Sequence, residues 1–258
     1  MGAPWPAGPP GPPGRPKRPA HQNPWIWVVL GVVVAVVLLH THRITQFDVV
    51  LFLVLIPSIV LHEVSHGYVA WIFGDDTAKR AGRLTLNPIP HIDPFGSIIL
   101  PALLVLSGAG AFGWARPVPV NLARLRHPRN QAVLVSLAGP ATNIAIAVVC
   151  GLAFGLATPV TVRNELALLG FNAVSLRYQI LFMAGYANVI LAVFNLLPIP
   201  PLDGSALLER IMPRSWIPGY LRLRPFTIVV PLLIVMVYPA VLDKIFQPAL
   251  DLWAHLLG

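Results

Sequence analysis

The sequence predicts an all-α polytopic membrane protein with five to six transmembrane helices, a re-entrant segment and a small β element near the cytoplasmic face. Two observations lead to this fold class. First, 56% of the 258 residues are hydrophobic and only 11% are charged, whereas soluble domains carry about 25% charged residues. Second, several apolar runs approach the roughly 20 residues that a helix needs to cross a bilayer. The low charge excludes a soluble enzyme and a disordered chain, and the single cysteine, Cys150, excludes a disulfide scaffold.

The chain divides into a tail and a membrane-embedded domain. Residues 1–24 contain nine prolines and four glycines. This composition offers no apolar face to bury and predicts a disordered tail. Residues 25–258 form the predicted membrane-embedded domain. Its six apolar runs are 25–39, 47–73, 95–112, 132–157, 180–197 and 226–246.

The third run, 95–112, contains Pro101 and need not cross the membrane. Because Lys and Arg accumulate in cytoplasmic loops, their distribution tests this point. If all six runs cross, the 18 Lys and Arg residues divide evenly between the two sides. If residues 95–112 re-enter instead, 14 of them lie on the side of the N-terminus and 4 on the other. This bias favours a re-entrant segment, a cytoplasmic N-terminus and an integral protein of a plasma membrane, which we expect to be bacterial.

A cluster of ionisable residues lies inside the second run. His62 and His66 are four residues apart, so they share one face of a helix and can bind one ion. Glu63 lies beside them, near enough to accept a proton from a water that such an ion activates. Ionisable groups are unfavourable in hydrocarbon and usually serve a function there. The spacing therefore predicts a metal site rather than polar contacts between helices.

A catalytic zinc site usually takes three protein ligands and a water. Acidic residues are few in this chain, and Asp203 is the outstanding candidate for the third ligand because it follows the fifth apolar run. Pro198, Pro200 and Pro201 precede it and exclude a regular helix. The unwound chain that results could direct Asp203 toward an ion held by another helix.

Together these motifs resemble the site-2 proteases, which are intramembrane zinc metalloproteases. The resemblance rests on His-Glu-x-x-His at 62–66 and on Asn-x-x-Pro-x-x-Pro-x-Asp-Gly at 195–204. It covers about residues 47–210, the motif core of what would then be a metalloprotease domain spanning 25–258. The segment 139–143 (Gly-Pro-Ala-Thr-Asn) resembles a third element of that family. The resemblance implies an endopeptidase that hydrolyses peptide bonds in or near transmembrane segments.

The resemblance also implies roles for individual residues. One zinc ion per chain would bind to His62, His66 and Asp203, with Glu63 as the catalytic base or acid. Asn195 matches an asparagine that is thought, in that family, to polarise the scissile carbonyl or hold its oxyanion. The implied partners are a transmembrane protein substrate and the lipid bilayer, and not nucleic acid, despite the net charge of +8.

Several features have more than one interpretation. Residues 82–87 alternate as in a strand, which predicts either an edge strand that pairs with an extended substrate or a plain surface hairpin. His91 and Asp93 either form a second metal site or water path, or shape the entry to the re-entrant segment through local hydrogen bonds. Asn143 either bonds to a metal ligand or joins two helices. For the whole chain, the alternative to a protease is a membrane transporter or channel whose buried His, Glu and Asp carry metal ions or protons.

Overall fold

The computed structural model describes residues 45–101, 103, 113–213, 215–223 and 239–257. Every regular element in these ranges is a helix, which confirms the predicted all-α class. The longer helices are α2 (Gln46–Ile72), α5 (Pro128–Ala157), α6 (Val160–Leu169), α7 (Leu176–Leu196) and α11 (Pro239–Ala254). The short ones are α3 (Thr77–Arg80), η2 (Ile89–His91), η3 (Pro94–Ile99), η4 (Leu122–Arg124), η5 (Phe171–Ala173), α8 (Ser205–Ile211) and α9 (Ile217–Leu223).

Three of these helices, α2, α5 and α7, are long and apolar enough to cross a membrane. They coincide with the predicted apolar runs 47–73, 132–157 and 180–197. Helix α11 contains the end of the sixth run. Three predicted segments lie outside the described residues: the proline-rich tail at 1–24, the first run and the rest of the sixth run. Five to six crossings therefore stay a prediction, of which the described residues show three.

Local sequence signals set the ends of the three long helices. Thr45 caps α2 in a capping box, in which its hydroxyl accepts from Asp48 N–H at 3.3 Å and the Asp48 carboxylate accepts from Thr45 N–H at 2.8 Å. Helix α5 begins at Pro128. Proline is favourable there because it lacks an N–H, and an N–H in the first turn has no acceptor within the helix. Helix α7 ends at Leu196, two residues before Pro198, because a proline disfavours helical backbone in the residue before it.

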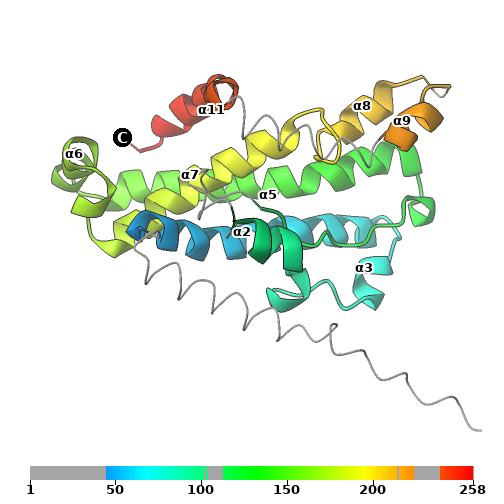
Figure 1. The fold of residues 1–258 in the computed structure, drawn as a ribbon, viewed down its shortest axis with the longest axis horizontal. Coiled ribbons are helices and arrows are strands. Elements are labelled where there is room, and N and C mark those ends of the chain that lie inside the picture. The colour runs from blue at the N-terminus through cyan, green and yellow to red at the C-terminus, as the bar shows by residue number, and fades with distance from the viewer. Residues whose placement is uncertain (1–44, 102, 104–112, 214, 224–238, 258) are drawn as a thin grey trace, which may run out of the picture.

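Figure 1 shows α2, α5 and α7 side by side, with α5 running in the opposite direction to the other two. The connection from α2 to α5 therefore begins and ends at the same end of the bundle. A re-entrant segment within this connection requires that arrangement, whereas a full crossing by residues 95–112 would make α2 and α5 parallel. Because residues 102 and 104–112 lie outside the described ranges, re-entry itself stays a prediction.

The β element predicted at 82–87 is not confirmed. In the part of the chain that the structure describes there is no strand, and 82–87 consists of a turn and bends. The backbone of this segment bonds to its own neighbours: Gly82 N–H donates to Lys79 O at 3.0 Å, and Arg83 N–H to Ala78 O at 2.9 Å. Alternating residues form a strand only where a second strand is available to pair with them, so pairing of this segment with an extended substrate stays a prediction.

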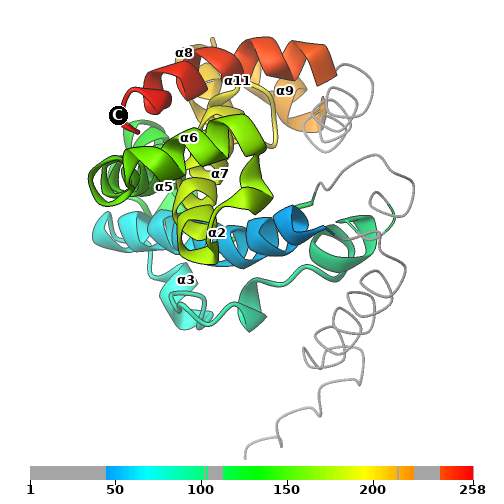
Figure 2. The same cartoon turned by 90° about the vertical axis from the view of Figure 1, so that its left-hand side faces the viewer.

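Helix α11 packs against α7 and α5, on the side of the bundle away from α2 (Figure 2). Its anchor is Trp253, which is 6% exposed and donates from Nε1 to Ala147 O at 2.8 Å. Large apolar side chains such as Leu53 on α2 and Val149 on α5 are exposed on the protein surface. In a membrane these faces contact lipid, so the exposed apolar side chains make no unfavourable contact with water.

Candidate metal centre

Helix α2 positions the two histidines on the side that faces α5 and α7. The imidazoles of His62 and His66 are one helical turn apart and almost fully buried, with 6% and 9% of each residue exposed. Glu63 lies on the same turn and is partly exposed. The helical periodicity that predicted a shared ion is therefore present in the structure.

The segment after α7 returns Asp203 to the end of its own helix. Leu197 leaves the helix with extended backbone, and Gly204 N–H then donates to Asn195 O at 2.7 Å, which closes the proline-rich segment into a tight loop. A Cβ at Gly204 would overlap the carbonyl of Leu196, so only glycine permits this closure. The closed loop places Asp203 opposite α2 rather than away from the bundle.

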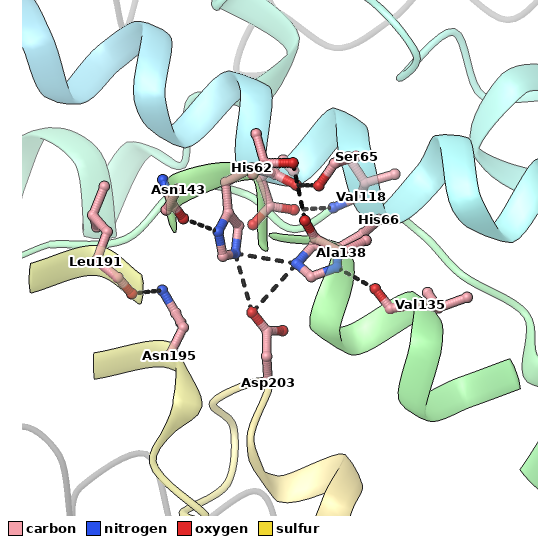
Figure 3. Close-up of polar contacts among 12 residues, drawn as sticks. His62, Ser65, His66, Val118, Val135, Ala138, Asn143, Leu191, Asn195 and Asp203 are labelled. Carbon is pink, nitrogen blue, oxygen red and sulfur yellow. Dashed lines mark hydrogen bonds and ion pairs between the residues drawn. The ribbon is translucent and has the colours of Figure 1, made fainter. Parts of the chain in front are cut away.

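The three predicted ligands meet at one point between α2 and the end of α7. His62 Nε2 lies 3.1 Å from His66 Nε2, and Asp203 Oδ2 lies 3.1 Å and 3.4 Å from these two atoms. Figure 3 shows the two rings, both from α2, and the carboxylate, from the loop after α7, converging on one point. Ligand atoms about 2.0–2.2 Å from a tetrahedral zinc ion lie about 3.3–3.6 Å apart. The observed separations are close to those of a zinc site.

The hydrogen-bond partners of the two Nδ1 atoms also favour a cation at the centre. His66 Nδ1 faces the backbone carbonyl of Val135 at 2.7 Å, and His62 Nδ1 faces Asn143 Oδ1 at 2.5 Å. These acceptors hold a proton on each Nδ1, which leaves lone pairs on both Nε2 atoms. Asp203 Oδ2 is buried and has no hydrogen-bond partner. Two imidazole nitrogens and a carboxylate oxygen that converge in this way are a donor set that zinc binds, so the residues present fit zinc.

Glu63 is held by a backbone group that no sequence pattern had indicated. Its Oε2 accepts a hydrogen bond from Val118 N–H at 2.8 Å. The segment that carries Val118 is fixed at both ends: Arg83 donates to Arg116 O at 2.7 Å, and Asn121 N–H donates to the carboxylate of Asp75 at 2.5 Å. Both Asp75 and Arg83 are buried. The connection between α2 and α5 therefore orients the glutamate beside the histidines.

Asn195 lies near the centre but is not directed at it. Its Nδ2 donates to Leu191 O, one turn back on α7, at 2.9 Å (Figure 3). A primary amide has a second N–H, and this one is the group that could contact a substrate. The structure brings together the three proposed ligands and places Glu63 beside them, whereas the role of Asn195 stays a prediction.

His91 and Asp93 make local hydrogen bonds instead of forming a second metal group. His91 Nε2 bonds to Thr85 O at 3.0 Å, and burial lowers the pKa of this histidine. Asp93 caps η3 by accepting from Gly96 N–H at 2.7 Å. Among the described residues, the group of potential metal-ligating side chains is that of His62, His66 and Asp203.

Comparison with known proteins gives the family. The chain is 44% identical, over 63% of its length and 69% of the relative, to "Putative zinc metalloprotease YwhC" of Bacillus subtilis. It is 36% identical to "Putative zinc metalloprotease Rip2" of Mycolicibacterium smegmatis over 59% of this chain, a match that spans about half (53%) of that relative. No solved structure matches.

A comparison with protein-family models matches residues 50–238 to Peptidase family M50. This match covers most of the chain and contains the group of potential metal ligands, so the chain belongs to Peptidase family M50, the site-2 protease family of zinc metalloproteases.

Proposed function

We propose that the protein is an intramembrane endopeptidase that hydrolyses peptide bonds in or near transmembrane segments of other membrane proteins. The observation that supports this most strongly is the convergence of two imidazole nitrogens and a carboxylate oxygen within 3.4 Å of one another, from α2 and from the loop that follows α7, two helices that are apolar enough to span a bilayer. His62, His66 and Asp203 are the proposed zinc ligands. The glutamate that a hydrolytic reaction needs, Glu63, lies on the same helical turn as these histidines.

Each group in the site has a proposed task. When bound, zinc supplies a Lewis acid that makes water nucleophilic near neutral pH and polarises the scissile carbonyl. Glu63 accepts the proton of the attacking water and returns it to the leaving amine. Its bond from Val118 N–H fixes the orientation of the carboxylate during both transfers. Asn195 would turn its second N–H toward the oxyanion of the tetrahedral intermediate. The hydrogen bond between them would become stronger as negative charge develops on that oxygen.

The location of the site limits how a substrate can bind. His62 lies ten residues before the end of α2 at Ile72, which is about 15 Å along the helix axis. A helical substrate has its carbonyls in internal hydrogen bonds, so it must unwind locally before a carbonyl can reach the site. We place the site toward the cytoplasmic face of a bacterial plasma membrane, with the N-terminus on that side, because the Lys and Arg residues favour this orientation.

Purified protein in detergent, incubated with a model transmembrane substrate, tests the proposal. We expect about one zinc per chain in the wild type and in Glu63→Gln, and cleavage by the wild type alone. Glu165→Gln is the matched control, because Glu165 is an exposed glutamate on α6 away from the metal centre, and it should cleave as the wild type does. Cleavage by Glu63→Gln at the wild-type rate, or zinc-dependent ion flux in liposomes without cleavage, would contradict the protease and favour a transporter.

A further inference from the structure

A chain of buried side chains connects His62 to helix α7 and returns to α2. His62 Nδ1 bonds to Asn143 Oδ1 at 2.5 Å, and Asn143 Nδ2 donates to Asn188 Oδ1 at 2.6 Å. Asn188 Nδ2 in turn donates to Ser58 Oγ and to Ala184 O, each at 2.8 Å. Asn143 and Asn188 are 0% exposed, so water does not compete for any of these groups. The sequence had singled out Asn143 but not Asn188 or Ser58.

The far end of this chain fixes the direction of every hydrogen bond in it. Ser58 Oγ donates to Val54 O at 2.8 Å, so it accepts from Asn188, and Ala184 O is a carbonyl that can only accept. Asn188 must therefore direct its NH2 group at these two acceptors and its Oδ1 at Asn143. Asn143 must then donate to Asn188 and present its own Oδ1 to the histidine.

An oxygen at that position determines the tautomer of His62. An acceptor facing Nδ1 requires the proton to be on Nδ1, which leaves the lone pair on Nε2, the atom that faces Asp203. His66 needs no such relay, because its Nδ1 bonds directly to a backbone carbonyl, that of Val135. Thus one of the two histidines has its tautomer fixed by backbone and the other by side chains from α5 and α7.

We propose that Asn188 is a positioning residue for the metal centre: by orienting Asn143, it holds His62 in the tautomer that binds zinc. This inference rests on the proposed function, in which His62 is a ligand. It gives α7 two tasks, because the helix that carries Asn188 also ends in the loop that bears Asp203. The competing interpretation is that the two asparagines only join helices, as polar residues in membrane bundles do.

The two interpretations differ in what happens to zinc affinity when substrate is absent. With an apolar residue at 188, Asn143 loses the acceptor that orients it, and its amide can turn its NH2 toward His62 Nδ1. The imidazole would then carry its proton on Nε2 and lose its lone pair for zinc. Removal of such outer partners weakens metal binding by about 10–100-fold. A purely structural role would lower thermal stability and leave zinc affinity unchanged.

The test measures the zinc affinity of the full-length protein in detergent by competition with a chelator, together with its thermal unfolding. We expect Asn188→Leu to bind zinc about 10–100-fold more weakly than the wild type. Asn188→Asp retains an oxygen toward Asn143 and should stay within about threefold of the wild type. Ser58→Ala should also stay within about threefold, since the Ala184 carbonyl still orients Asn188.

Val189→Ala is the matched control, because Val189 is the next residue on α7, is 7% exposed and packs in an apolar cluster. It should lower the unfolding temperature without weakening zinc binding. Wild-type zinc affinity in Asn188→Leu, or an equal loss in Val189→Ala, would overturn the inference while leaving the proposed function intact. If Asn188→Leu does not fold, Asn188→Ala is used in its place, and the same loss of zinc affinity is expected. If the wild-type protein binds no zinc, the proposed function and this inference are both overturned.

Discussion

Gly139 is the position at which a single methyl group should have the largest effect on the metal centre. It lies on α5 opposite the histidines, and a Cβ built there would lie 2.5 Å from His62 Cε1, 2.5 Å from His66 Nε2 and 2.6 Å from His62 Nε2. Non-bonded contacts of carbon are favourable at about 3.5–4.0 Å, so Gly139→Ala requires the rings to move by about 1 Å. The backbone of α5 cannot easily retreat, because the helix packs against both α2 and α7.

A displacement of that size is several times what a metal site tolerates, since ligand distances are held to about 0.2 Å. We therefore expect Gly139→Ala to bind zinc at least about tenfold more weakly than the wild type, equivalent to about 1.4 kcal/mol or more. The assay is chelator competition on purified protein, read as zinc bound per chain. Loss of cleavage should follow the loss of zinc and be reversed in part by excess zinc.

The control separates the metal centre from packing in general. Gly151 lies on the same helix, and a Cβ there would lie 2.6 Å from Trp253 Nε1. Gly151→Ala should thus overpack the bundle to a similar extent, by about 1–3 kcal/mol, and keep wild-type zinc affinity. If Gly139→Ala folds and keeps wild-type zinc affinity, this prediction is wrong. The imidazole rings would then tolerate a methyl group that overlaps them in the structure.

Three further predictions concern the segments that support the site. Val118→Pro removes the N–H that holds Glu63 and should lower kcat about tenfold or more with one zinc still bound, measured by single-turnover cleavage. Gly204→Ala should open the loop that returns Asp203 and reduce zinc occupancy, whereas Gly219→Ala, which meets no neighbour, should not. Burial raises the pKa of the Asp75 carboxyl, but hydrogen bonds from a hydroxyl and two backbone N–H groups outweigh this and lower it. Because the folded pKa is below the unfolded value of about 3.9, ionised Asp75 stabilises the fold above that pH, and this stabilisation is lost as the pH falls through the folded pKa. Asp75→Asn should therefore be less stable than the wild type at pH 7 and differ less from it under strongly acidic conditions, as measured by thermal unfolding.

Much of the architecture could be predicted because it depends on neighbours in the chain. The spans α2, α5 and α7 follow from apolar runs of bilayer length. The shared face of His62 and His66 follows from helical periodicity. The strand predicted at 82–87 is not confirmed for the opposite reason: a strand is defined by a partner, and alternation within one segment carries no information about whether a partner exists.

The sequence by itself determined that the protein lies in a membrane, which residues are the candidate metal ligands, and that the chain unwinds before Asp203. Only the tertiary structure decided that Asp203 meets the histidines, that Val118 N–H bonds to Glu63 and that Asn143 bonds to Asn188. These contacts join residues far apart in the chain, and some of them use backbone groups that every residue possesses. Such groups acquire an individual role only from where the fold places them, so no side-chain pattern can indicate them.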